Sequence, residues 1–469
     1  MTTHTLAQRP IPGPRAFPLF GKQVNLLRFY RNPFRLLRSL HATYGHVAAL
    51  AQGDPSFVFA FGSEMNHQLL AQPELFENGT GPLIRLPKNT AVERLFAQNL
   101  AVMNGTHHKQ QRRLMQPAFH RQQVQGYCTD MVALTERMLD RWQPHSSIDL
   151  LTEMQQLTQQ IAVKTLFGVD DEAELRQVGT LMRRAITLTT SPLALLAPFN
   201  VPGLPFHRAN RLTERLEDYI RSLAARKRKE PDATDVLATL VRVREEDGAK
   251  LSDAELIGHA FTLFVAGHET TSNALTWTLF LLNQHPRICA DLLEELEGTL
   301  HGAAPTVEQL GQLRLLEGVV KESLRLLPPA PIGIRIAAAD CELGGYALPR
   351  GANVIYSEFI THRLPELYPE PDRFKPERWF TLERSTYEYL PFAAGPHMCI
   401  GWAFAMQELK LVLAMLLQRY RLAVVPGATI APHIGMRPVR GMPMRVLVQD
   451  RQFERVPVRG GIHELVDMA

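Results

Sequence analysis

The chain has 469 residues, 45% of them hydrophobic, so it is long enough to bury a large core and to enclose a cofactor. Its 51 basic and 47 acidic residues give a formal net charge of +4, and no Lys/Arg block or RNA-binding signature argues for a nucleic-acid partner. The four cysteines, at 128, 289, 341 and 399, form no C-x-x-C or C-x-x-C-H pattern, which argues against a zinc site, a redox dithiol and covalently attached c-type haem.

The ends of the chain predict no targeting segment. Residues 1–10 are polar and predict a flexible N-terminus without the charged-then-apolar pattern of a signal peptide. The most apolar stretches, Leu256–Ala266 and Leu275–Leu282, are separated by polar residues and fall short of the roughly 20 residues of a membrane span. Four scattered cysteines fit a reducing cytoplasm. We therefore expect a cytoplasmic protein with one domain over residues 11–450 and a C-terminal tail over 451–469.

Periodicity and turn residues predict the elements in chain order. The Ile11-Pro-Gly-Pro14 leader cannot be helical, because proline restricts both its own backbone and that of the residue before it. A helix is expected next, then two short strands, then mainly helices from residue 62 to about 300, and finally a mixture of strands and one more helix. The expected early and late elements are helices over 32–44 and 408–420 and strands over 47–51, 57–61, 335–338, 352–356 and 444–448. This order predicts an α+β fold that is mainly α-helical.

A long buried helix is expected from Ser252 to Gln284. Ser252 and Glu255 have the spacing of a capping box, and His285-Pro286 ends the helical pattern. Its centre contains Ala266-Gly-His-Glu-Thr-Thr271, where a glycine and polar side chains interrupt an apolar helix. Such a local conflict suggests a site at which a ligand approaches the backbone. A kink, with threonine hydroxyls bonded back to the helix, explains the segment equally well.

Two further segments carry reactive or charged side chains. A helix over Leu315–Leu327 contains Glu322 and Arg325 at i,i+3 spacing, which on its own describes an ordinary surface ion pair. The segment Phe392–Gly401 combines a Gly-Pro turn with Cys399 and is followed by a helical stretch. A cysteine beside a helix N-terminus is stabilised as thiolate, although a lone cysteine is more often a buried, inert residue.

The three segments, in this order, resemble the cytochrome P-450 family of haem-thiolate monooxygenases. The pattern F-x-x-G-x-x-x-C-x-G is complete and highly specific, A-G-x-E-T-T is complete, and E-x-x-R lies between them. Phe374–Trp379 is similar to the family's P-E-R segment. The resemblance extends from about Ile11 to Val448 and implies a helix-rich cytochrome P-450 fold with haem b buried in the core.

The resemblance implies a role for each matching residue. Cys399 is the expected iron ligand, with Phe392, Gly395, Gly401, Ala266 and Gly267 around the haem. Glu322, Arg325 and Arg378 are expected to form a buried structural network. The expected contacts to the haem propionates are His108, Arg112, Arg335 and His397, each of which is otherwise an ordinary surface residue. His108 stands where many members carry Trp, and His397 where Arg is common.

The resemblance also implies a reaction. Thr270 is expected to hydrogen-bond the bound oxygen and Glu269 to deliver protons, so that one oxygen atom from O2 enters a C–H or C=C bond. Two alternatives remain: a haem-thiolate enzyme that uses peroxide, and a haem-based sensor without turnover. The intact Glu269-Thr270 pair argues against both. Measurement of reductant-dependent oxygen consumption would separate the three.

The substrate and electron donor are expected from the same resemblance. Because the sequence has no G-x-G-x-x-G motif, electrons should come from a ferredoxin or flavodoxin with an NAD(P)H-dependent reductase. A lipophilic substrate such as a fatty acid or terpenoid is expected, because the candidate walls of the pocket are apolar. These walls are Phe261, Phe264, Val265, Ala266, Ala330, Pro331, Ile332, Ile334 and 434–436, under a lid over 186–206. Arg85, Lys88 and Arg94 leave a carboxylate-bearing substrate open, although a solvated loop is the more ordinary explanation for them.

Overall fold

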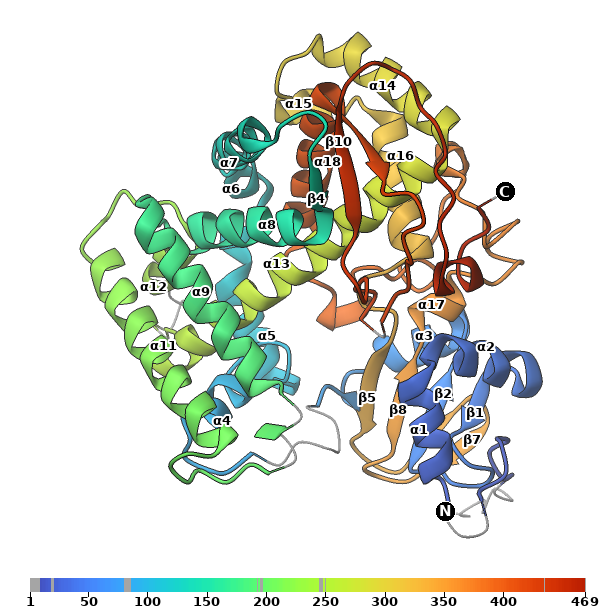
Figure 1. Cartoon of the computed structure of the whole chain (residues 1–469). Helices are drawn as coiled ribbons and strands as arrows, with labels where there is room; N and C mark the ends of the chain where they lie inside the picture. Colours follow the sequence, from blue (N-terminus) through green and yellow to red (C-terminus); the bar gives the residue numbers. More distant parts are fainter. Residues whose placement is uncertain are drawn as a thin grey trace.

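Helices make up most of the chain, and the described strands form three small sheets (Figure 1). The structure, a computed structural model, describes residues 9–17, 21–79, 86–191, 193–194, 197–243, 248, 250–433 and 435–468. The helices are α1 Gln23–Arg31, α2 Pro33–Tyr44, α3 Ser63–Leu70, α4 Ala91–Ala97, α5 Gly105–Met115, α6 Arg121–Gly126, α7 Cys128–Arg141, α8 Leu150–Phe167, α9 Glu172–Thr189, α11 Pro205–Lys227, α12 Val236–Arg242, α13 Asp253–Gln284, α14 Pro286–Leu300, α15 Val307–Leu310, α16 Arg314–Leu326, α17 Glu358–Thr361 and α18 Trp402–Arg419. Short 3-10 turns are η1 Gln116–Phe119, η2 Pro376–Phe380, η3 Gly395–His397 and η4 Gly461–Glu464. The predicted α+β, mainly helical class is confirmed.

The largest sheet has the strand order β1-β2-β8-β5-β3, with β2 and β8 parallel and the other neighbours antiparallel. A second sheet has the order β4-β10-β9, and β6 and β7 form a hairpin. The strands are β1 Val47–Ala49, β2 Phe57–Ala60, β3 Phe76–Glu77, β4 Ser147–Asp149, β5 Gly333–Ala337, β6 Cys341–Leu343, β7 Tyr346–Leu348, β8 Asn353–Tyr356, β9 Tyr420–Val424 and β10 Pro443–Val448. The sheets therefore join early and late parts of the chain.

The Pro-Gly-Pro leader lies along β1. The N–H of Ala49 donates to the carbonyl of Pro12 at 2.7 Å, and that of Gln52 donates to Pro14 at 2.9 Å. A Cβ at Gly13 would lie 2.5 Å from the carbonyl oxygen of Ala49, so only glycine allows this close approach. The leader thus covers an edge of the large sheet.

Helix α13 runs through the middle of the molecule beside α8 (Figure 1). Its expected capping box is present: the Ser252 hydroxyl accepts from the Glu255 N–H, and the Glu255 carboxylate accepts from the Ser252 N–H. Nearly all residues from Thr271 to Leu282 are buried in the main hydrophobic core. The helix is therefore a fixed central support for whatever lies against its middle turns.

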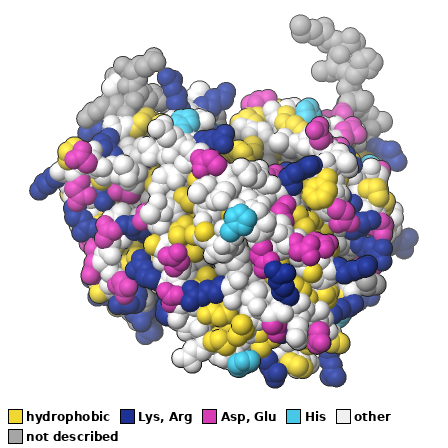
Figure 2. Space-filling model, turned by 90° about the horizontal axis from the view of Figure 1, so that it is seen from above, with side chains coloured by type: hydrophobic (Ala, Val, Ile, Leu, Met, Phe, Trp, Pro, Cys, Tyr) yellow, Lys and Arg dark blue, Asp and Glu magenta, His cyan; other side chains and the backbone are white. Residues whose placement is uncertain are grey.

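The last part of the chain packs on the same core. Ile462, Leu465 and Val466 are buried, and Arg363 donates to the carbonyl of Leu465 at 2.9 Å. The expected division at residues 10 and 450 stays a prediction. Among the described residues, no helix is long and apolar enough to cross a membrane. On the face seen in Figure 2, Lys/Arg and Asp/Glu side chains are interspersed, with scattered apolar groups between them.

Candidate functional site

A cavity of about 330 Å³ is bordered by α13 on one side and by the segment before α18 on another. Helix α13 contributes Ala266, Gly267 and Thr270, and the other segment contributes Phe392 and Cys399. Most of the remaining lining residues are apolar, among them Leu263, Ala330, Ile332, Pro391 and Phe404. The cavity therefore brings together two motifs that lie about 130 residues apart in the sequence.

The backbone before α18 holds Cys399 at the cavity wall. The Cys399 N–H donates to the carbonyl of Phe392 at 2.8 Å, which closes a loop around η3. Gly395 has φ +69°, and a Cβ there would lie 2.1 Å from the carbonyl oxygen of Leu70, so the loop requires glycine at this position. Cys399 itself is three residues ahead of Trp402, the first residue of α18.

Cys399 is accessible from the cavity, although protein surrounds it on the other sides. Burial raises the pKa of its thiol, while the Gly401 N–H and the charge of Arg112 lower it in part. The sequence suggested that the helix N-terminus would favour the thiolate, but burial outweighs that effect. A further positive charge beside the sulfur, such as a metal ion, would favour the ionised form of Cys399.

Gly267 and Thr270 face the same cavity from α13. A Cβ added to Gly267 would meet no atom within 4 Å, so contact with the rest of the chain does not explain this mid-helix glycine. The Thr270 hydroxyl donates to the Ala266 carbonyl at 2.6 Å, as the alternative based on backbone bonding expected. Glu269 is exposed and does not line the cavity.

Four basic side chains gather at the His397 end of the cavity. The rings of His108 and His397 lie 3.8 Å apart between centroids, and Arg112 donates to the carbonyl of Met398 at 2.7 Å. Burial and Arg112 lower the pKa of His108 to about 4, whereas burial, His108, Arg335 and Arg112 lower that of His397 to about 3. In the part of the chain that the structure describes, no carboxylate forms an ion pair with any of the four. The cluster is therefore suited to anionic groups.

These observations fit a haem. An accessible thiol lies in an apolar cavity, a glycine leaves the facing helix open, and a basic cluster at one end could receive the two carboxylates that a haem carries. The nitrogen of His397 lies 2.9 Å from the amide nitrogen of Asn78, so Asn78 fixes the ring that faces this cluster. The residues that would hold the group are Cys399, Arg112, Arg335, His108 and His397.

Glu322, Arg325 and Arg378 meet in the core, as the resemblance implied. Arg325 makes two hydrogen bonds to the Glu322 carboxylate, at 2.9 and 2.8 Å, and Arg378 makes one at 3.0 Å. The indole of Trp379 and the N–H of Lys375 add two more donors. Glu322 and Arg325 are fully buried, and the surrounding cations hold the pKa of Glu322 below its usual value despite its burial. Arg325 also donates to the carbonyls of His362, Pro371 and Arg373, so the network ties α16 to the segment before η2.

Only some of the expected pocket walls line this cavity. Ala266, Ala330 and Ile332 do, whereas Phe261 and Phe264 are buried in the core. Met436 is also buried and accepts a hydrogen bond from Trp277. Ile434 lies outside the described residues, as do parts of the expected lid over 186–206. Leu193, Phe199 and Val201, in the described part of that segment, are exposed.

Of the basic residues considered as carboxylate ligands, Lys88 and Arg94 do not line the cavity. Arg94 makes two hydrogen bonds to Glu217, at 3.1 and 2.7 Å. Lys88 is exposed, and Arg85 lies outside the described residues. Arg94 therefore has an internal partner, and nothing in its position favours an acidic substrate.

Several functional candidates carried no recognisable motif in the sequence. Tyr356 and Glu358 line the cavity, and Arg335 lies over the Tyr356 ring with its guanidinium carbon 5.4 Å from the ring centroid. Asn78 and Met398 contact the basic cluster. Only their position at the end of the strand over 353–356 or shortly after it, or beside a motif residue, could have drawn attention to them.

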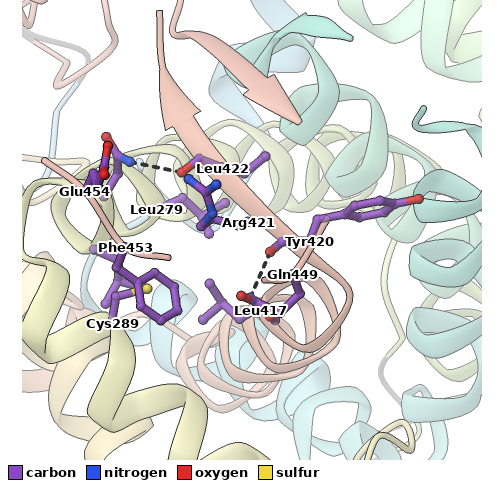
Figure 3. Close-up of a pocket in the computed structure, with 11 residues that line it drawn as sticks. Leu279, Cys289, Leu417, Tyr420, Arg421, Leu422, Gln449, Phe453 and Glu454 are labelled. Atoms are coloured by element: carbon purple, nitrogen blue, oxygen red, sulfur yellow. Dashed lines mark hydrogen bonds between the residues drawn. The ribbon is translucent and has the colours of Figure 1, made fainter. Parts of the chain in front are cut away.

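A second cavity, shown in Figure 3, is too small to be the site. It measures about 20 Å³ and is lined by Cys289, Leu417 and Phe453 among others. That volume holds about one water molecule. Burial raises the pKa of the Cys289 thiol to about 12, so this cysteine is unreactive near neutral pH.

Comparison with known proteins identifies the family. The family model for cytochrome P-450 matches residues 11–439. Cyclooctat-9-en-7-ol 5-monooxygenase of Streptomyces melanosporofaciens is 34% identical over 428 residues, which cover 89% of this chain and 90% of that protein. Pentalenene oxygenase of Streptomyces avermitilis is 30% identical over 441 residues, which cover 92% and 95%.

The fold is also found among solved structures. The structure of a cyanobacterial protein with retinoic acid bound aligns with a TM-score of 0.82 at 24% identity, covering 94% of this chain and all of that one. The match supports the fold, while the family model and the two Streptomyces relatives support the activity. The chain belongs to the cytochrome P-450 family and is a haem-dependent monooxygenase.

Proposed function

We propose that this enzyme inserts one oxygen atom from O2 into a C–H or C=C bond of an unsaturated cyclic hydrocarbon of the terpenoid type, or of an alcohol derived from it. The observation that carries the proposal is a single apolar cavity onto which Cys399, Gly267 and Thr270 all face. The names of the two Streptomyces relatives describe oxygenation of an unsaturated alcohol and of an alkene. Fatty acids are the second candidate class, and they are less favoured because Arg94 of α4 already pairs with Glu217.

Residues that line the cavity or lie at its end would hold the haem that this reaction needs. Haem b, when bound, supplies the activation of dioxygen, and a thiolate ligand favours cleavage of the O–O bond. Cys399 would be the iron ligand, with Phe392 and Gly401 beside it on the cavity wall. The cluster of His108, Arg112, Arg335 and His397 would orient the haem by binding its carboxylates.

Thr270 would hold a proton near the oxygen substrate. Its hydroxyl hydrogen points to Ala266, so its oxygen lone pairs are free to accept a hydrogen bond in the cavity. Glu269 is the preceding residue and is exposed, so its carboxylate is accessible to solvent. Thr270 and Glu269 would thus pass protons between solvent and the cavity, while the apolar walls exclude bulk water.

Electrons would come from a ferredoxin or a flavodoxin with its NAD(P)H-dependent reductase, in the cytoplasm. The experiment combines the purified protein with each donor pair, a cyclic terpene alkene and 18O2. We expect consumption of oxygen that depends on the reductant and a product that contains one 18O atom. Product formed from hydrogen peroxide alone would favour the peroxide-using alternative, and ligand binding without product would favour the sensor.

A further inference from the structure

One lining residue of the cavity has no partner and no role so far. Glu358, the first residue of α17, lines the cavity and is only 3% exposed. Its Oε2 atom has no hydrogen-bond partner, and no cation among the described residues pairs with the carboxyl. An unpaired acid costs several kcal/mol to bury, so a glutamate at this position needs an explanation other than packing.

The local backbone fixes where Glu358 lies. It follows β8 after one residue, Ser357, and the N–H of Phe359 donates to the carbonyl of Pro331 at 3.1 Å. Pro331 is flanked by Ala330 and Ile332, which also line the cavity. Glu358 therefore belongs to a wall that is otherwise apolar, beside the segment after α16.

Burial favours the uncharged form of the Glu358 carboxyl. Burial alone raises its pKa well above the usual value, and none of the neighbouring charges contributes. No ion pair among the described residues joins Glu358 to an arginine of the basic cluster that suits the haem carboxylates.

A protonated carboxylic acid offers one O–H donor and one carbonyl acceptor. The complementary group is a hydroxyl, which can accept the first bond and donate the second. Resting on the proposed function, we propose that Glu358 binds a hydroxyl group of an otherwise apolar substrate and thereby determines which carbon faces Thr270. The preferred substrate is then a lipophilic alcohol rather than the bare hydrocarbon.

Glu408 provides a matched control for this inference. It too is buried, has an unpartnered oxygen, and has a pKa well above the usual value because of burial. Unlike Glu358, it does not line the cavity. A general effect of removing a buried acid would appear at both positions, whereas an effect on ligand choice would appear only at Glu358.

The test compares the dissociation constants of the haem-loaded protein for geraniol, farnesol and geranylgeraniol with those for the corresponding hydrocarbons that lack the hydroxyl. For each pair, calorimetry gives the ratio of the dissociation constant of the hydrocarbon to that of the alcohol. For at least one pair we expect Glu358→Leu to lower this ratio by roughly tenfold, the usual effect of removing one buried hydrogen-bond partner. Glu358→Gln, which keeps a donor and an acceptor, should restore most of it, and Glu408→Gln should leave it unchanged. An unchanged ratio in Glu358→Leu for all three pairs would overturn the inference, since a residue that contacts only the haem affects both ligands alike.

A second measurement covers the case in which Glu358→Leu does not fold. Infrared difference spectra of the unaltered protein should show the carbonyl band of a protonated carboxylic acid shifting to lower frequency when the alcohol binds. Glu358→Gln should lack that band. No shift on saturation with any of the three alcohols would contradict the inference. Because both measurements report binding, they remain interpretable even if the 18O experiment shows no oxygenation.

Discussion

At the scale of single residues, the four cysteines differ in what surrounds them. Cys399 borders the large cavity, whereas Cys128 and Cys289 are buried in the hydrophobic core. Burial raises the pKa of each of these three thiols and so favours the protonated form of each. Cys399 differs from Cys128 and Cys289 because it borders a cavity large enough for a ligand, and this position depends on the fold.

The first prediction concerns this ligand. The reduced protein with carbon monoxide should show the strongly red-shifted Soret band of a thiolate-bound haem, and Cys399→Ala should abolish it. Cys289→Ala is the matched control and should keep the band, because Cys289 borders only the small cavity in Figure 3. If Cys399→Ala retained the band, Cys399 would not be the ligand.

The second prediction concerns Thr270. Without its hydroxyl, protons should reach the oxygen substrate more slowly, and peroxide should be released instead of product. Because positioned proton transfer contributes about 10²–10⁴-fold to rates, we expect Thr270→Ala to reduce product per NAD(P)H at least about tenfold while haem binding is kept. Thr270→Ser, which retains a hydroxyl, should behave much more like the unaltered enzyme. Peroxide per NAD(P)H is the measurement, and equal ratios in all three proteins would remove Thr270 from the reaction.

At the scale of elements, local signals predicted the long helices and five of the strands, namely β1, β2, β5, β8 and β10, but not the other strands. The capping box at Ser252 and the proline after His285 placed α13 to within a residue at either end. Short strands such as β3 and β4 were not expected, because they depend on partners far along the chain: Phe76 pairs with Ala337, and Ser147 with Arg445. No periodicity is readable in strands of two or three residues.

The third prediction concerns α16. Glu322→Ala should leave Arg325 and Arg378 buried without their acceptor and lower the free energy of unfolding by about 3–5 kcal/mol. That is a large part of a typical stability of about 5–15 kcal/mol, so haem retention should fall with it. The measurements are urea unfolding and haem content per chain.

Glu317 on the same helix is the control. It pairs with Lys321 at the surface, where its side chain is 39% exposed. Glu317→Ala should therefore cost less than about 1 kcal/mol. Similar losses for the two variants would mean that the buried network contributes no more than a surface ion pair.

At the scale of the whole molecule, the site is assembled from distant segments. The motifs around Cys399 and Thr270 could be recognised in the sequence because several residues at fixed spacing carry each of them. Glu358 and Asn78 could not, because each is a single residue whose role depends on a cavity and on neighbours elsewhere in the chain. For the same reason, the sequence could not show that Arg94 is paired with Glu217 rather than available to a substrate.

The last prediction concerns the class of substrate. The cavity lining is mainly apolar, and burial of apolar surface contributes about 25 cal/mol per Å², so a ligand that buries about 200 Å² gains roughly 5 kcal/mol. Terpenes and their alcohols should therefore shift the spin state of the ferric protein at low concentration, whereas sugars and free amino acids should not.

Fatty acids carry both an apolar chain and a carboxylate, so their binding tests whether the protein recognises a carboxylate in addition to an apolar chain. Since Arg94 already has Glu217 as its partner, Arg94→Gln should leave the dissociation constant of a fatty acid unchanged within about twofold, well under the effect of one lost hydrogen bond. Tight spin-state shifts with the polar compounds alone would contradict the prediction, and a large loss of fatty-acid binding in Arg94→Gln would show instead that this arginine turns from Glu217 to the substrate.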